Sequence, residues 1–172
     1  MTADGLVCPV DGAICTLGGS AAATALKNSF EPEERVELFS YLEQDVKSLR
    51  PIPHGKSRII PGEGHWDWLV IVAALPHHCN DIIISENHFA SVLERAVVNG
   101  IRMSCQQEIE SLAMTVMGSS YRVPAQVGIR CAVNAMRVCR KEDIRIIWCF
   151  LDEDLLGLAE NLLLKAGIPI AC

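Results

Sequence analysis

The chain has 172 residues, of which 50% are hydrophobic and 21% charged, as in an ordinary globular protein with a substantial core. Its 15 basic and 21 acidic residues give a net charge of −6, and no cluster of Lys and Arg stands out in the sequence. This balance argues against nucleic acid as a partner, because a phosphate backbone is bound by clustered cations.

The first half of the chain alternates between strand and helix patterns. It predicts a strand, a helix, a longer helix, a short strand and a long buried strand, over residues 5–9, 21–27, 32–50, 57–60 and 66–75. The first strand breaks at Pro9, and Ser20 caps the first helix. The longer helix carries an apolar stripe at helical spacing, formed by Val36, Phe39, Leu42 and Val46. Residues 69–74 are apolar on both faces, which is typical of a parallel sheet.

The second half continues this alternation. It predicts a helix to about Gln107, a strand from Leu112, a helix, a strand over residues 144–151, a Leu-rich helix and a short edge strand at 168–170. The first residues or caps of the three helices are expected to be Ser85 or Asn87, Val123 or Pro124, and Asp152. The middle helix carries an apolar face formed by Val127, Cys131, Ala135 and Val138. Gly167 closes the last helix, which ends at Lys165.

This order of elements predicts an α/β protein. We expect one domain over residues 1–172, built as a three-layer α/β/α sandwich around a mixed, mostly parallel central sheet. In open sheets of this kind, ligands bind outside the carboxyl ends of the strands. Strand-to-helix turns at that edge are therefore the first places to look for a binding site.

Neither a signal peptide nor a membrane span is expected. The N-terminal residues lack a basic segment followed by an apolar run, and the longest apolar run, from Leu69 to Pro76, is shorter than the roughly 20 residues that cross a bilayer. A membrane contact would need a segment outside this chain. The eight cysteines form no C-x-x-C pair and several lie in apolar runs, so we expect reduced thiols in a cytoplasmic protein.

Two turns of small residues lead from a strand into a helix. The first is Leu17-Gly18-Gly19-Ser20, and the second begins at Gly118 and continues through Ser119, Ser120, Tyr121 and Arg122 to Pro124. Such turns leave backbone N–H groups free at a helix N-terminus, where they can hold an anion. Two of them in one small α/β domain indicate a pocket for a ligand with more than one phosphate.

These segments resemble the motifs of macro domains. Residues 3–11, Ala-Asp-Gly-Leu-Val-Cys-Pro-Val-Asp, together with the Gly18-Gly19 turn, are similar to the family's first motif, in which an Asp enters a strand that leads into a Gly-rich loop. Residues 110–124 are similar to the second motif, in which a strand leads into a phosphate loop, an aromatic residue and a Pro that opens a helix. The strand at Ile144 and the following Asp152 match the family's C-terminal end.

The resemblance implies binding of ADP-ribose or a related nucleotide, with no cofactor and no metal. Gly18, Gly19 and Ser20 would line one side of the diphosphate, Gly118, Ser119 and Ser120 the other, and Tyr121 would lie against the distal ribose. Leu17 and Asp11 would lie beside the first loop, and Arg122 would either pair with a phosphate or point to solvent. The ligand-binding set is therefore Asp11, Leu17, Gly18, Gly19, Ser20, Gly118, Ser119, Ser120, Tyr121 and Arg122.

The chain departs from the family pattern in ways that favour binding over turnover. Catalytic macro hydrolases place Asn in the first turn, and residues 8–11 contain none; the strand whose Asp contacts adenine is also missing before Asp4. The first hypothesis is a non-catalytic sensor of an NAD-derived nucleotide, as in bacterial defence or signalling systems. The alternatives are an ADP-ribosyl hydrolase that uses Asp11 and a histidine, and a scaffold or oligomerisation domain.

Other residue patterns carry weaker predictions. The loop that contains His77, His78 and Cys79 lacks the spacing of zinc ligands, so we expect no metal there, although its histidines could contact a ligand at a strand end. Cys8 and Cys15 have no local base that would make either of them a nucleophile. The sequence leaves homo-oligomerisation open.

Overall fold

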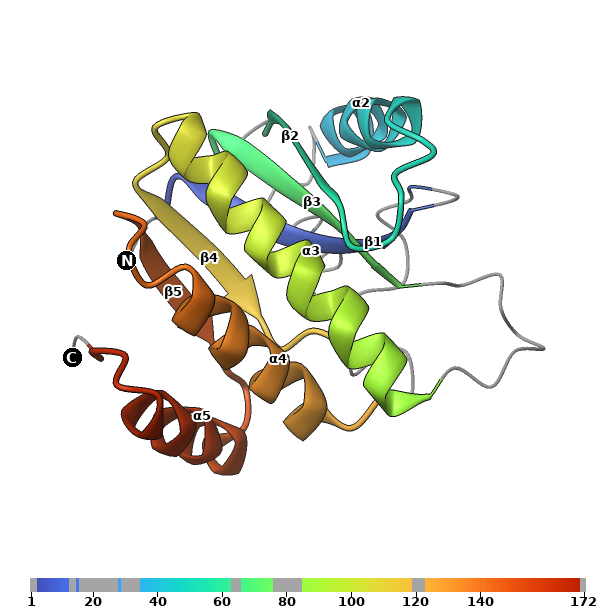
Figure 1. The fold of residues 1–172 in the computed structure, drawn as a ribbon. Helices are drawn as coiled ribbons and strands as arrows, with labels where there is room; N and C mark the ends of the chain where they lie inside the picture. The colour runs from blue at the N-terminus through green and yellow to red at the C-terminus, as the bar shows by residue number, and fades with distance from the viewer. Residues whose placement is uncertain are drawn as a thin grey trace.

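A five-stranded sheet forms the centre of the computed structural model, which describes residues 3–12, 15, 28, 35–62, 66–75, 85–118 and 123–170 (Figure 1). The strands are β1 (Gly5–Asp11), β2 (Ser57–Pro61), β3 (Trp68–Leu75), β4 (Ser111–Thr115) and β5 (Arg145–Cys149). Their order across the sheet is β2-β3-β1-β4-β5. The four strands β3, β1, β4 and β5 run parallel, and β2 is antiparallel to β3. The sheet is therefore mixed and mostly parallel, as predicted.

Helices cover both faces of this sheet, so the three-layer prediction is confirmed. The described helices are α2 (Arg35–Ser48), α3 (Glu86–Gln106), α4 (Ala125–Val138) and α5 (Glu153–Lys165). Alternate residues of β3 enter two different cores: Val70 and Val72 pack with α3 and α4, whereas Leu69 and Ile71 pack with α2. α5 lies beside α4 and buries Ala159 between the two helices.

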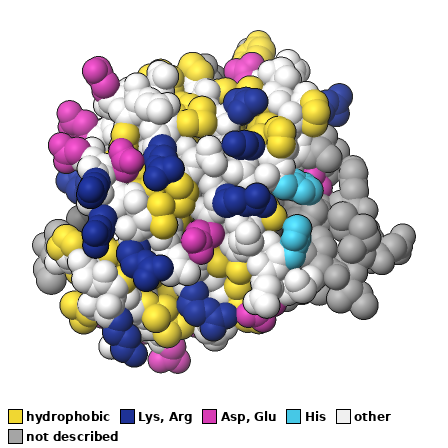
Figure 2. Space-filling model, in the orientation of Figure 1, with side chains coloured by type: hydrophobic (Ala, Val, Ile, Leu, Met, Phe, Trp, Pro, Cys, Tyr) yellow, Lys and Arg dark blue, Asp and Glu magenta, His cyan; other side chains and the backbone are white. Residues whose placement is uncertain are grey.

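Many charged side chains lie on the face of the molecule that α3 and α4 form. Figure 2 shows Lys and Arg side chains spread across this face, interspersed with acidic and apolar side chains. Two arginines of these helices pair with nearby acids: Arg130 of α4 with Glu86 at 3.0 Å, and Arg102 of α3 with Glu142 at 3.7 Å. Because the pairs are exposed, each contributes at most about 1 kcal/mol to stability.

Asp4 sets the alignment of β1 and β4 at the start of both strands. Its Oδ2 accepts hydrogen bonds from the backbone N–H of Ser111 at 2.8 Å and from the Ser111 hydroxyl at 2.9 Å, while the Asp4 amide donates to Ser111 Oγ at 3.0 Å. The Asp4 carbonyl oxygen accepts from the amide of Trp68 at the start of β3, at 3.0 Å. One residue thus ties three parallel strands together, and their carboxyl ends emerge at one edge of the sheet.

Most predicted elements are present with boundaries shifted by a few residues. Ser85 is the cap of α3, and its Oγ accepts the His88 amide at 3.2 Å. α3 continues through Gly100, as expected. Leu42 and Val46 of the predicted α2 stripe are fully buried. The side chains of Val36 and Phe39 and the predicted helix at 21–27 lie outside the described residues.

Four details of the prediction are wrong. β1 does not break at Pro9 but continues to Asp11. Only Gly5 and Leu6 pair with β4, so the missing N–H of Pro9 removes no hydrogen bond between β1 and β4. Val138 is 48% exposed. The buried residues Val127, Cys131 and Ala135 are four positions apart, and the next residue at this spacing is the buried Cys139, not Val138.

The other two corrections concern the C-terminal region. β5 ends at Cys149, the last residue with a partner in β4, and Leu151 is fully exposed. Residues 168–170 form no strand, because the Ile168 amide donates to the Leu163 carbonyl at 3.0 Å and closes α5. Gly167 has the expected positive φ of 68° at that closure.

Candidate functional site

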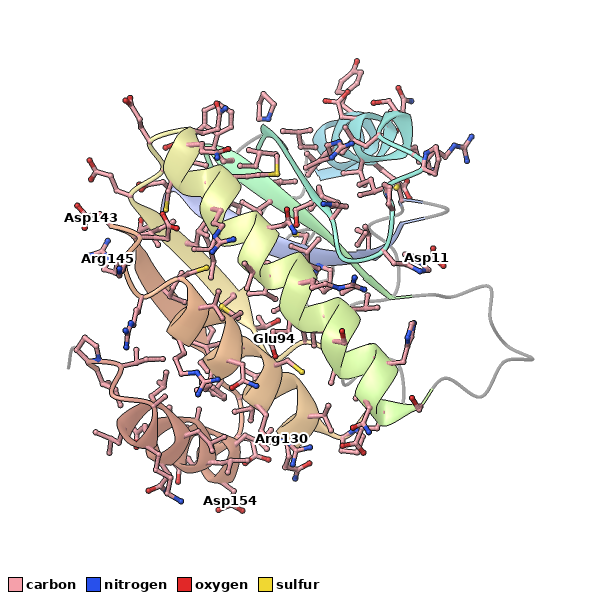
Figure 3. All side chains as sticks on the ribbon, viewed as in Figure 1. Asp11, Glu94, Arg130, Asp143, Arg145 and Asp154 are labelled. Atoms are coloured by element: carbon pink, nitrogen blue, oxygen red, sulfur yellow. The ribbon has the colours of Figure 1, made fainter. Side chains whose placement is uncertain are left out.

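The candidate site lies where β1, β3 and β4 end at the same edge of the sheet. The chain leaves these parallel strands at Asp11, Leu75 and Thr115. Asp11 is labelled at this edge in Figure 3 and is only 3% exposed. A parallel sheet binds ligands outside this edge, so the loops after the strands determine what the molecule can hold.

The loop after β1 is held against the segment that leads into β2. Any side chain at Gly12 would overlap the Ile52 carbonyl oxygen, and the Ile52 amide donates to the Gly12 carbonyl at 2.7 Å. Cys15 then turns back with a φ of 45°, its amide donating to the Asp11 carbonyl at 2.8 Å. Since its backbone contacts leave no room for a larger residue at Gly12, this loop has a defined path directly after Asp11.

The loop after β4 turns at Gly118, which has a φ of 101° and is buried. A Cβ at this position would lie 3.2 Å from Phe89 Cζ of α3 and 3.5 Å from Val123 Cβ. Both the backbone conformation and the crowding therefore favour glycine. α4 packs directly behind this turn, because a side chain at Gly128 would overlap the Met117 carbonyl oxygen.

The N-terminus of α4 differs from those of α3 and α5. Ser85 caps α3, and Asp152 caps α5 by accepting the amides of Asp154 at 2.9 Å and Leu155 at 3.1 Å. Both of those helices also have an acidic residue in the first turn. At α4 the cap position is Pro124, which makes no side-chain hydrogen bond to the helix, and the first turn contains no acid. Among the described residues, the Val127 amide donates to the Pro124 carbonyl at 2.9 Å, and no side chain caps the first turn. The positive end of the helix dipole and the other first-turn N–H groups therefore suit an external anion.

Thiol chemistry is disfavoured near the site. Burial raises the pKa of the Cys8 thiol to about 12, and Cys8 lies in the strand that leads to Asp11. Burial also raises the pKa of the Cys15 thiol; its contact with the Ile52 backbone opposes this rise, and the Asp11 carboxylate adds to it. Both thiols are therefore protonated at neutral pH, and a protonated thiol is a poor nucleophile.

Two of the ten predicted ligand-binding residues can be located, and they are at the same edge of the sheet. Asp11 ends β1, and Gly118 begins the turn after β4. Leu17, Gly18, Gly19, Ser20, Ser119, Ser120, Tyr121 and Arg122 lie outside the described residues, as do His77, His78 and Cys79.

The described part of the chain contains no group of three or more His, Cys, Asp or Glu residues arranged to hold a metal ion. No helix in that part combines the length and the apolar character needed to cross a membrane.

Sequence reasoning missed the residues that shape the site from behind. Ile52 supports the loop after β1, Phe89 lies under Gly118, and Gly128 lets α4 approach that turn. These contacts join residues far apart in the chain and have no local signature. A signal was present for α4, because neither of its predicted starts, Val123 or Pro124, is a Ser, Thr, Asp or Asn cap.

The sequence matches no protein-family model and no curated protein. Its structure, however, is similar to solved macrodomains. The Oceanobacillus iheyensis macrodomain solved with ADP has a TM-score of 0.70 at 12% identity, over 96% of this chain and 85% of that one. The macrodomain of Mycobacterium tuberculosis DarG has a TM-score of 0.60 at 14% identity, over 86% of this chain and 89% of that one.

A third similar structure contains the ligand that the sequence motifs imply. The Trypanosoma brucei macrodomain in complex with ADP-ribose has a TM-score of 0.67 at 14% identity, covering 94% of this chain and 64% of that one. At these identities the likeness concerns the fold. The chain thus has the macrodomain fold, as its two motifs predict.

Proposed function

We propose that this chain binds ADP-ribose or a related NAD-derived nucleotide at the carboxyl edge of its sheet. The observation that carries this proposal is the uncapped N-terminus of α4, which stands directly behind the Gly118 turn. In the same fold, the Oceanobacillus iheyensis and Trypanosoma brucei macrodomains were solved with ADP and with ADP-ribose, respectively.

A diphosphate matches the chemistry of this edge. A helix N-terminus has about half a positive elementary charge and several N–H groups without internal acceptors. At Gly118, a side chain would crowd Phe89 and Val123, whereas glycine allows the backbone to turn close to a ligand. In our proposal, the loop after Asp11 holds the other side of the diphosphate through Gly18, Gly19 and Ser20.

We further propose that binding occurs without turnover and needs no cofactor or metal. The segment from Cys8 to Asp11 lacks the Asn residues of catalytic macro hydrolases, and the thiols of Cys8 and Cys15 are protonated at neutral pH. A binding domain of this kind would serve as a cytoplasmic sensor in a signalling or defence system. The signal would then be the change of the protein from its free to its ligand-bound state.

One observation favours a second candidate, an ADP-ribosyl hydrolase. Asp11 is 3% exposed and ends the strand beside the proposed site, where a carboxylate could act as a general base. The two candidates differ in whether this chain removes ADP-ribose from a modified protein during incubation. Release that is lost in Asp11→Asn would establish the hydrolase and reject the sensor.

Calorimetry with ADP-ribose tests the binding itself, and Gly118→Glu tests its location. We expect heat on titration of the wild-type protein and a loss of binding by at least about a hundredfold in the variant, because the new side chain would push the turn away from Phe89 and bring a carboxylate next to the proposed phosphate site. Gly167→Glu is the matched control: it adds the same charge at another positive φ, 68°, where nothing lies within 4 Å of the new Cβ. Unchanged affinity in a folded Gly118→Glu protein would reject this site, and wild-type protein that binds no ADP-ribose derivative would leave the scaffold alternative.

A further inference from the structure

The two edges of the sheet differ in how well they resist pairing with another strand. At the β2 edge, Arg58 is exposed and Pro61, which cannot donate a ladder hydrogen bond, ends the strand. In β5 the only charged residue is Arg145, the first of the strand, and the run from Ile146 to Leu151 contains no Pro, Gly or charged residue. Uncharged apolar edges of this kind readily accept a further strand.

The backbone of β5 presents free hydrogen-bonding groups outwards. The Arg145 amide donates to the Glu110 carbonyl at 2.9 Å and so points towards β4. Because successive residues of a strand alternate in direction, the amides and carbonyls of Ile146 and Trp148 point away from β4. Among the described residues, β4 is the strand that pairs with β5, and no strand pairs on its outer side.

The side chains around this edge are only partly covered. Ile146, Ile147 and Trp148 are half-buried, although they lie in the middle of the strand, and Leu151 just after it is fully exposed. Ile147 belongs to none of the three packed apolar clusters of the described chain. Burial of these apolar surfaces by another strand would be favourable.

Charged residues at the two ends of β5 indicate which strand would pair with its outer edge. Arg140, Lys141 and Arg145 are exposed at its start, where Asp143 is an exposed acid and Glu142 pairs with Arg102. Exposed acidic residues follow its end: Asp152, Glu153 and Asp154. Figure 3 shows Asp143 and Arg145 near one end of the strand and Asp154 beyond the other.

We propose that two copies of this chain pair through antiparallel β5 strands, forming one continuous sheet across a two-fold axis near Ile147. In this arrangement the start of each β5 lies beside the end of the other. Arg140 and Lys141, which precede one β5, then lie towards the acidic residues that follow the end of the other, so ends of opposite charge approach each other on both sides of the axis. Parallel pairing would instead place like charges together. The interface is thus self-complementary, as a two-fold dimer requires.

Sedimentation of the whole chain tests this dimer through charge reversal. We expect wild-type protein to sediment as a dimer at micromolar concentrations. The double variants Arg140→Glu with Lys141→Glu, and Glu153→Lys with Asp154→Lys, should each raise the dimer dissociation constant about tenfold or more. An equimolar mixture of the two should dimerise again, because each reversed end then meets its opposite. As a control, Arg95→Glu with Arg137→Glu reverses two exposed cations on α3 and α4 and should leave the dimer intact.

Ile146→Pro gives a second test based on the backbone. It removes an outward-pointing N–H without removing a bond to β4, so the protein should stay folded by circular dichroism but become monomeric. A wild-type protein that is monomeric throughout would overturn the proposal, as would a mixture of the reversed variants that fails to dimerise. ADP-ribose titration of each variant separates this interface from the ligand site, because binding should be unchanged.

Discussion

Two helical glycines in this fold should respond to the same substitution in opposite directions. Alanine is favoured over glycine in the interior of a helix by about 0.5–1 kcal/mol. At Gly157 of α5 nothing lies within 4 Å of the new Cβ, so this preference should act alone. At Gly128 of α4 the new methyl group would overlap the Met117 carbonyl oxygen, a backbone atom that cannot rotate away.

The expected magnitudes follow from these surroundings. Overpacking of this kind typically costs about 1–3 kcal/mol, which exceeds the gain in helix propensity. For a domain of this size, 1 kcal/mol shifts the melting temperature by roughly 2–4 °C. Gly128→Ala should therefore lower the melting temperature by several degrees, and Gly157→Ala should raise it by about 1–4 °C.

Thermal and urea unfolding, followed by circular dichroism, measure both variants under the same conditions. Gly128→Ala should also weaken ADP-ribose binding, because α4 would have to move away from the Gly118 turn. If the two variants shift the melting temperature in the same direction and by the same amount, the close packing of α4 against the end of β4 is refuted, and with it the proposed position of the helix dipole.

Four further predictions concern stability and thiol chemistry. Asp4→Ala should lower the free energy of unfolding by about 2–3 kcal/mol, since it removes the acceptor that joins β1 to β4; a change below about 0.5 kcal/mol would show that the bonds to Ser111 contribute little. Asp152→Ala should cost about 1 kcal/mol through loss of the α5 cap, measured by urea unfolding, and Asp152→Asn should restore most of it. The raised pKa of Cys8 implies that the stability due to its protonated thiol is present below pH 9 and is lost as the pH rises from about 9 towards 12, because the unfolded chain releases the proton first. In the native protein at pH 8, a thiol reagent should label the exposed Cys149 and spare Cys8; rapid labelling of Cys8 would contradict its burial.

The candidate site was predictable where it depends on local patterns. Small residues after the second motif strand indicated a tight turn, and Gly118 indeed has a φ of 101° there. The match of Asp152 to a cap and Gly167 to a helix closure followed in the same way from local chemistry. By contrast, the crowding of Gly118 by Phe89 joins two segments that no periodicity connects.

The class of fold could be read from the sequence, because alternating apolar patterns specify which segments bury one face and which bury two. The order of the strands could not, since pairing of β1 with both β3 and β4 depends on packing and on bonds such as those of Asp4. The tertiary structure also decided that Pro9 stays within a strand and that, among the described strands, β5 has a neighbour on one side only, because these outcomes depend on which strands lie alongside each other. Local chemistry specifies the elements, and long-range contacts specify which edges and helix ends remain free to bind.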